Sequence, residues 1–339
     1  MKKLSLQKWC SVFSCVLLLA GLLTACGAPA QPEEPSAEAV TVNITALKGP
    51  TAMGMVQLMN QADDGEFSDA EYRFNIASSI DEVTPALAKG ETDIAAVPAN
   101  VASVLYNRTK GGIEVLAINT LGVLYIVENG DTVHSVENLR GRTIYASGKG
   151  ATPEYALNYI LTENGIDPMN DVTIEWKSEH AECLAALMAD ESAIAMLPQP
   201  FVTTAQTKSE SIRVALDLTK EWDALQEGSE QPSAMLTGVL VARREFVEQN
   251  PEAVHAFLQR YQASVEQVNA DNEMAAKLIG AYDIVPEAVA LKALPACNIV
   301  YIDGAEMQQK LSGYLSVLFE QNPEAVGGAL PQDDFYFAG

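Results

Sequence analysis

The stretch "ETDIAAVPAN" (91–100) is followed one hundred positions later by "ESAIAMLPQP" (191–200). Both combine an apolar run with a proline that stops it. When residues 78–98 are set against 178–198 without a gap, eight of 21 positions are identical. A period near 100 residues is too long for the unit of a solenoid, so the sequence predicts a duplicated lobe.

The likeness continues on both sides of this stretch. "NITALKGPTAMGMVQLM" (43–59) is similar to "TIYASGKGATPEYALNYIL" (143–161) after two residues are inserted in the loop. "EVLAINT" (114–120) is similar to "RVALDLT" (213–219). Each copy therefore predicts the same order of elements. These are strand (40–47; 142–147), helix (51–62; 153–164), strand (72–77; 171–176), helix (80–89; 179–189) and strand (93–97; 193–197).

Alternating strands and helices of these lengths predict right-handed βαβ crossovers and mostly parallel sheets. The last strand of each copy is apolar throughout, as expected for a strand that is buried on both faces. Pro98 and Pro198 cannot donate a backbone hydrogen bond, so each is predicted to end its strand. Ligands of open α/β sheets bind at this carboxyl edge.

After the second copy the chain is predicted to cross back. "MLTGVLVARREFVEQNPEAVHAFLQRY" (235–261) predicts a strand followed by a helix. We therefore expect an α/β protein with two lobes. Lobe one takes residues 40–121 plus 238–330, lobe two takes 122–237, and 331–339 form a C-terminal tail. The crossings near Leu121–Gly122 and Thr237–Gly238 are predicted to form a hinge, since glycine eases rotation there.

The N-terminus predicts export. "MKKLSLQK" (1–8) is basic, and the apolar run 12–23 is shorter than the roughly 20 residues of a membrane-spanning helix. Residues 1–25 are therefore predicted to be a signal peptide. Residues 26–39, rich in Pro, Ala and Glu, are predicted to be a disordered tether.

Composition excludes several function classes. Without the three lysines of the signal, 18 basic side chains face 45 acidic ones, and nucleic acid is excluded as a partner. Cys183 and Cys297 are predicted to be buried thiols. His180, Glu182 and Cys183 align with Ile80, Glu82 and Val83, so we expect no metal site there. No G-x-S-x-G, HExxH or CxxC motif occurs, so no catalytic residue is predicted.

Taken together, these blocks resemble the extracytoplasmic substrate-binding proteins of ABC importers, in the branch that binds nitrate, aliphatic sulfonates, taurine and thiamine pyrimidines. The resemblance rests on "LTAC" (23–26), "KGPTAMGM" (48–55), "KGETDIAAVPAN" (89–100), "LRGRTIYASGKGATPEYALNYIL" (139–161), "IAMLPQPF" (194–201) and "VARREFVEQNPEAVHAFL" (241–258).

The resemblance implies a clamshell of the type II periplasmic-binding-protein class that closes on a small organic ligand and delivers it to a permease and, through it, an ATPase. "LTAC" resembles a lipobox, which implies diacylation of Cys26 and anchoring on the outer face of a bacterial cell membrane. A monomer without metal or cofactor is expected.

The two loop–helix junctions predict the ligand site. Helices that begin near Thr51 and Pro153 would direct unpaired N–H groups into the cleft, which suits an anionic or carbonyl-bearing ligand. Asn100 and Gln199 follow the strand-ending prolines. The full set of candidate ligand-binding residues is Gly49, Pro50, Thr51, Asn100, Ser147, Gly148, Thr152, Glu154, Gln199, Phe201, Thr237 and Gly238.

The sequence leaves alternatives for the identity of the ligand and for the function of the protein. Glu154 favours an amine or a ring N–H, so a planar or amine-bearing ligand is preferred over a sulfonate; alternatively, Glu154 only compensates the helix dipole. Phe201 either stacks on a planar ligand or plugs lobe two. The alternative functions are an enzyme that resembles the yeast thiamine-pyrimidine synthase, whose cysteine-rich motif is missing here, and a lipoprotein that signals to a membrane kinase.

Overall fold

The computed structural model describes residues 39–229 and 232–339, and within these residues the chain from Ala39 to the C-terminus is one compact unit. The predicted signal peptide, Cys26 and nearly all of the tether lie outside the described residues. Within them, no helix is both long and apolar enough to cross a membrane.

The first sheet has the strand order β11-β4-β10-β3-β1-β2. Strands β1 to β4 run in one direction, while β10 and β11 run in the other. Its strands are β1 (Val40–Leu47), β2 (Ala70–Ala77), β3 (Ile94–Pro98), β4 (Ile113–Leu121), β10 (Leu236–Arg243) and β11 (Ile299–Ile302). The prediction of a mostly parallel sheet is therefore confirmed, with β10 inserted against the common direction.

The second sheet has the order β7-β6-β8-β5-β9, and only β5 runs against the others. Its strands are β5 (Leu124–Asn129), β6 (Thr143–Ser147), β7 (Thr173–Lys177), β8 (Ile194–Pro198) and β9 (Ile212–Asp217). Each sheet with its flanking helices is called a lobe below, lobe one containing β1 and lobe two containing β6.

The two sheets repeat each other in order and in register. Ile44 pairs with Ile94 in lobe one, and Ile144 pairs with Ile194 in lobe two. In each sheet the strand inserted against the common direction lies beside the proline-ended strand: β10 beside β3, and β5 beside β8. Residues that lie one hundred positions apart in the repeat therefore occupy equivalent positions in the two sheets.

Pro98 and Pro198 end β3 and β8, as predicted. The four apolar residues before each proline are buried, because helices cover both faces of the sheet. A helix follows each proline within a few residues, namely α5 (Ala99–Thr109) after β3 and α8 (Phe201–Lys208) after β8. The two strands therefore deliver helix starts to the carboxyl edge of each sheet.

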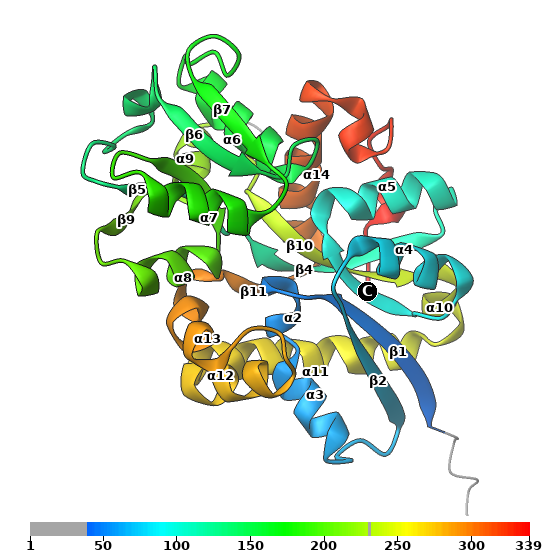
Figure 1. The fold of residues 1–339 in the computed structure, drawn as a ribbon. Coiled ribbons are helices and arrows are strands. Elements are labelled where there is room, and N and C mark those ends of the chain that lie inside the picture. Colours follow the sequence, from blue (N-terminus) through cyan, green and yellow to red (C-terminus); the bar gives the residue numbers. More distant parts are fainter. Residues whose placement is uncertain (1–38, 230–231) are drawn as a thin grey trace, which may run out of the picture. The chain divides into compact units, whose positions relative to one another are not determined.

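The helices flank the two sheets (Figure 1); those between the first three strands of each copy follow the predicted order, and the others were not part of that pattern. The helices are α2 (Pro50–Met53), α3 (Val56–Asp63), α4 (Ile80–Lys89), α5 (Ala99–Thr109), α6 (Thr152–Glu163), α7 (His180–Ala189), α8 (Phe201–Lys208), α9 (Leu218–Leu225), α10 (Arg244–Gln249), α11 (Pro251–Ala270), α12 (Asn272–Ala281), α13 (Glu287–Ala293) and α14 (Gly304–Gln321). Short 3₁₀ turns occupy Val136–Leu139, Leu294–Ala296, Pro323–Val326 and Asp333–Phe335.

The single helix predicted for 51–62 is instead two helices, α2 and α3, separated at Gly54 and Met55. The hydroxyl of Tyr261 lies 2.9 Å from the position that a Cβ on residue 54 would take. The break therefore lies where α11 comes close to the backbone, and glycine leaves room for that contact.

The chain changes sheet between Leu121, the last residue of β4, and Leu124, the first of β5. It returns at Leu236, which pairs with Leu121 in the β10–β4 ladder. The two crossings thus lie side by side. Helix α14 shares a hydrophobic core with residues of both lobes, and the ring of its Tyr314 lies 5.5 Å from Trp222 of lobe two. The exact boundaries of the lobes stay a prediction.

Candidate functional site

A pocket of about 400 Å³ lies between the carboxyl edges of the two sheets, and we call it the cleft. Lobe one and lobe two both contribute to its walls, including Pro98 and Pro198 at the matched strand ends. It is lined by Leu47, Lys48, Pro50, Thr51, Ser78, Ser79, Ile80, Pro98, Asn100, Val101, Val123, Leu124, Ala151, Thr152, Pro153, His180, Pro198 and Thr237.

Four helices of eight residues or more begin at the cleft. Ile80 and His180 are the first residues of α4 and α7, Thr152 is the first of α6, and Asn100 is the second of α5. A helix start carries unpaired N–H groups and the positive end of the helix dipole. Of the two helix starts that the sequence predicted, the one near Pro153 belongs to α6 and is among these four, whereas the one near Thr51 belongs to the four-residue α2. Together the four starts favour a ligand that accepts hydrogen bonds.

Asn100 and Thr152 contact each other across the cleft. The Thr152 hydroxyl of α6 donates to Oδ1 of Asn100 on α5 at 3.0 Å, and Nδ2 of Asn100 donates to the carbonyl of Ala325 at 3.2 Å. Two residues predicted separately, one in each lobe, are thus joined by a hydrogen bond. The lobes are held against each other at this point.

Thr51 is buried at the base of the cleft on α2. Its hydroxyl donates to the carbonyl of Leu47 at 2.7 Å, and its own carbonyl accepts from Nδ2 of Asn119 at 3.1 Å. A Cβ on Gly238 would lie 2.4 Å from the Thr51 methyl group. Because residue 238 is a glycine without a side chain, β10 can pass close to α2 at this point. The neighbouring residue, Thr237, lines the cleft.

His180 is a cleft residue that the sequence reasoning missed. Its Nδ1 lies 2.5 Å from the Ser147 hydroxyl, and its ring lies 5.3 Å from that of Phe201. Burial lowers the pKa of His180, so the imidazole is neutral at neutral pH. The available signal was the change from Ile80 to His180 at matched helix starts in the repeat.

A second pocket, of about 380 Å³, adjoins the cleft at His180, and we call it the side pocket. It belongs to lobe two and contains three of the predicted residues, Ser147, Gly148 and Phe201. Its complete lining is Ser147, Gly148, Ser178, Glu179, His180, Ala181 and Phe201. The predicted residues of lobe two are thus divided between the two pockets.

Four predicted residues line neither pocket: Gly49, Glu154, Gln199 and Gly238. The Glu154 carboxylate accepts from the N–H of Gly150 at 2.5 Å, and Oε1 of Gln199 accepts from the Thr203 hydroxyl at 2.9 Å. In the structure these two side chains stabilise their own loops. Their contact with ligand stays a prediction.

Charge in the cleft is sparse. Of the side chains that the structure describes there, Lys48 is the only one with a permanent charge, and its ammonium lies 3.1 Å from Asp283. An arginine or carboxylate does not occur among these lining residues. No group of three or more His, Cys, Asp or Glu in the described ranges has the arrangement of a metal site. Cys183 and Cys297 are free and buried, as predicted.

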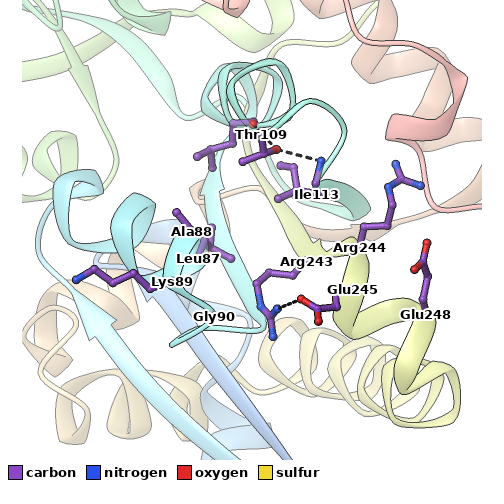
Figure 2. A pocket seen from close by; sticks show the side chains of 12 residues that line it. Leu87, Ala88, Lys89, Gly90, Thr109, Ile113, Arg243, Arg244, Glu245 and Glu248 are labelled. Atoms are coloured by element: carbon purple, nitrogen blue, oxygen red, sulfur yellow. Dashed lines mark hydrogen bonds and ion pairs between the residues drawn. The ribbon is translucent and has the colours of Figure 1, made fainter.

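A third pocket, of about 480 Å³, lies at the opposite edge of the lobe-one sheet, where β10 ends and β4 begins (Figure 2). Two arginines and Lys89 line it, but each already has an acidic partner, which for Lys89 is Glu91 at 4.0 Å. Arg243 contacts Asp93 at 2.7 Å, and Arg244 contacts Glu114 at 2.8 Å. The dashed line between Arg243 and Glu245 in Figure 2 marks a further contact of this arginine. This pocket therefore has little positive charge left for an anion.

Residues 66–284 match the family model of the periplasmic substrate-binding protein of phosphonate ABC transporters. The match covers more than half of the chain and includes β3, the second half of the repeat and β10. No curated protein matches the chain.

Solved structures of transport proteins share the fold. An ABC transporter structure from Parabacteroides distasonis is 23% identical with a TM-score of 0.72, covering 88% of this chain and 99% of that one. The periplasmic aliphatic sulphonate-binding protein of Escherichia coli is 15% identical with a TM-score of 0.69, covering 88% and 92%. The alkanesulfonate-binding protein of Xanthomonas axonopodis pv. citri, bound to MOPS, is 16% identical with a TM-score of 0.61, covering 87% and 96%.

Proposed function

Because the chain belongs to the family of periplasmic substrate-binding proteins of phosphonate ABC transporters, we propose that it is a receptor that captures a small organic ligand in the cleft. One observation supports this most strongly. Matched elements of the two lobes, including Ile80 with His180 and Pro98 with Pro198, line one pocket. A ligand in that pocket contacts both lobes at once, and its binding energy favours the closed arrangement.

The chemistry of the cleft supports a ligand with an acceptor head and an apolar body. The helix starts favour an oxyanion or a carbonyl, and Lys48, which is ion-paired with Asp283, is a secondary contribution. Most of the remaining wall is aliphatic or proline, as at Leu47, Val101 and Leu124. Since Glu154 lies outside the lining, the sequence argument for an amine loses its support. A planar organic anion or carbonyl compound is the ligand class that we propose.

We further propose that the receptor is a monomer, held at the outer face of the cell membrane by a diacylated Cys26, and that it delivers its ligand to an ABC permease. Two acyl chains hold a soluble domain stably, whereas one holds it only marginally. The signal-like residues 1–25 and the sequence "LTAC" support the anchor. Family membership supports the permease as partner.

Measurements of ligand binding to the purified protein test whether it is a receptor. The mature chain is screened by thermal shift and titration calorimetry against methyl- and phenylphosphonate, methane- and benzenesulfonate, nitrate, pyrimidines, flavins and amines. We expect at least one compound to bind with one-to-one stoichiometry and to raise the Tm. If no compound of this panel shifts the Tm or releases heat, the receptor proposal is wrong.

A further inference from the structure

His180 lies where the cleft joins the side pocket, since it is the one residue that belongs to the described lining of both. The side pocket is nearly as large as the cleft, about 380 Å³ against 400 Å³. A ligand held at the helix starts of the cleft therefore has space to continue past the His180 ring into lobe two.

The imidazole of His180 is held in one orientation. Its Nδ1 shares a hydrogen bond with the Ser147 hydroxyl of β6, and Phe201 of α8 packs against its ring. Within the described part of the chain, no protein group bonds to Nε2. One ring nitrogen is thus fixed by the protein, and the other is left for a ligand.

Phe201 forms the apolar wall of the side pocket. It packs against the buried core of lobe two that contains Cys183 and Leu197. It also belongs to the lining of the pocket, so part of its surface faces the empty volume. An aromatic wall of this kind binds a planar group by stacking or by edge contact.

The two pockets differ in charge. The cleft lining contains no carboxylate, and its Lys48 is ion-paired with Asp283, whereas Glu179 lines the side pocket. An anionic head is therefore favoured at the helix starts of the cleft, and a neutral group is favoured in the side pocket, where a second negative charge would be repelled by Glu179. This difference favours one orientation of the ligand, with its anionic end in the cleft and its neutral end beyond His180 in the side pocket.

We propose that His180 and Phe201 determine ligand specificity: the ligand places an acceptor head in the cleft within reach of Nε2 of His180, and a neutral planar group in the side pocket against Phe201. This inference rests on the proposed receptor function and names the part of lobe two that selects the ligand. We assign the tautomer in which the Ser147 hydroxyl donates to Nδ1 and the hydrogen of the neutral ring lies on Nε2, so that Nε2 is a donor to the ligand.

Matched ligand pairs test this proposal. Dissociation constants are measured by calorimetry for methyl- and phenylphosphonate and for methane- and benzenesulfonate. Wild-type protein is compared with Phe201→Ala, Phe201→Leu, His180→Ile and, as a control at an exposed histidine, His134→Gln. In the wild type we expect the phenyl member of at least one pair to bind about tenfold more tightly than the methyl member, because the ring is buried on binding.

Phe201→Ala is expected to abolish the preference for phenyl while the methyl member binds as before, and Phe201→Leu is expected to reduce it in part. His180→Ile gives lobe two the residue of lobe one, and it is expected to weaken both members about tenfold through the lost hydrogen bond. His134→Gln is expected to change nothing.

The proposal is overturned if wild type binds phenyl and methyl members equally, if neither phenyl compound binds, or if Phe201→Ala keeps the preference. A response to other compounds of the panel in these cases leaves the receptor function standing and removes only the side-pocket assignment. If the Ala variant is unfolded by its Tm, the Leu variant decides the same question.

Discussion

The starts of α4 and α7 occupy the same place in two copies of one fold, but they present different chemistry. In lobe one the sequence is Ser79-Ile80-Asp81, and the Ser79 hydroxyl accepts from the N–H of Asp81 at 3.1 Å. In lobe two it is Glu179-His180-Ala181, without a side-chain hydrogen bond at the N-cap among the described residues. Lobe one thus turns an isoleucine and a capped helix toward the cleft, whereas lobe two turns a histidine and an uncapped helix.

This comparison shows that the duplicated scaffold fixes where a side chain lies, while the side chain itself has diverged. Strand register and proline position agree between the copies. The residue at the helix start differs and sets what the lobe can bind. We therefore expect variants of shared scaffold positions to affect folding, and variants of the diverged positions to affect binding.

Gly238→Ala is expected to have the largest effect. A Cβ at this position would lie 2.4 Å from the Thr51 methyl group and 2.5 Å from Oδ1 of Asn119, so the added methyl forces α2 and β10 apart. We expect the free energy of unfolding to fall by about 2–3 kcal/mol in urea denaturation. Combining it with Thr51→Ser, which removes the clashing methyl, should restore part of the loss. A Gly238→Ala variant with wild-type stability would contradict the packing described here.

Replacing the N-caps compares the two helix starts directly. Ser79→Ala removes the hydroxyl that caps α4 and is expected to cost about 1 kcal/mol of unfolding free energy. Glu179→Ala is its matched control, because the Glu179 side chain caps nothing in α7, and the expected change is below about 0.5 kcal/mol. Equal losses in the two variants would mean that both helix starts are capped alike.

Thr152→Val removes the hydrogen bond between the lobes and keeps the shape of the side chain. The bond joins Thr152 of lobe two to Asn100 of lobe one, so its loss should weaken the arrangement in which both lobes contact the ligand. We expect ligand to bind about three- to tenfold more weakly with little change in Tm. Gln199→Ala serves as comparison, since its amide oxygen accepts from Thr203 inside lobe two. That variant should lower the Tm instead. If Thr152→Val lowered the Tm and Gln199→Ala weakened binding, Thr152 would be the structural residue and Gln199 the ligand-site residue.

His180→Ile is expected to change the pH dependence of stability. Burial lowers the pKa of His180 below its ordinary value of 6.5, so between the two values the unfolded chain binds more protons than the folded one. The wild-type free energy of unfolding therefore falls as the pH is lowered through this window. Glu179 and Lys48 are the charged side chains that share its pockets.

His180→Ile removes this contribution, so its stability should decline less between pH 7 and pH 5 than that of wild type or of His134→Gln. Each unit by which the pKa is lowered corresponds to about 1.4 kcal/mol. Parallel stability curves for His180→Ile and wild type would show that the ring is not buried in its neutral form.

Much of the scaffold was predictable because its signals are local. Continuous apolar runs that end at Pro98 and Pro198 predict buried strands that stop at one edge, and the repeat transfers this prediction from one lobe to the other. The break at Gly54 was not predictable, since its cause is Tyr261, which lies more than two hundred residues away.

The lining of the cleft was predictable only in part. The sequence predicted Thr51, Asn100 and Thr152 as site residues, and all three line the cleft, while their contact with a ligand stays a prediction. Because residue 180 aligns with the apolar Ile80 in the repeat, His180 was not predicted as a site residue. Sequence also could not determine the direction of Glu154 and Gln199, because their loop contacts depend on tertiary geometry.

Hydrogen–deuterium exchange with and without a ligand from the panel tests the central claim most directly, because it reads both lobes at once. We expect ligand to slow amide exchange at once in the first turns of α4 and α5 in lobe one and of α6 and α7 in lobe two. Unchanged exchange around the paired arginines of the third pocket is the internal control. Protection limited to one lobe would contradict a ligand site shared between the two copies.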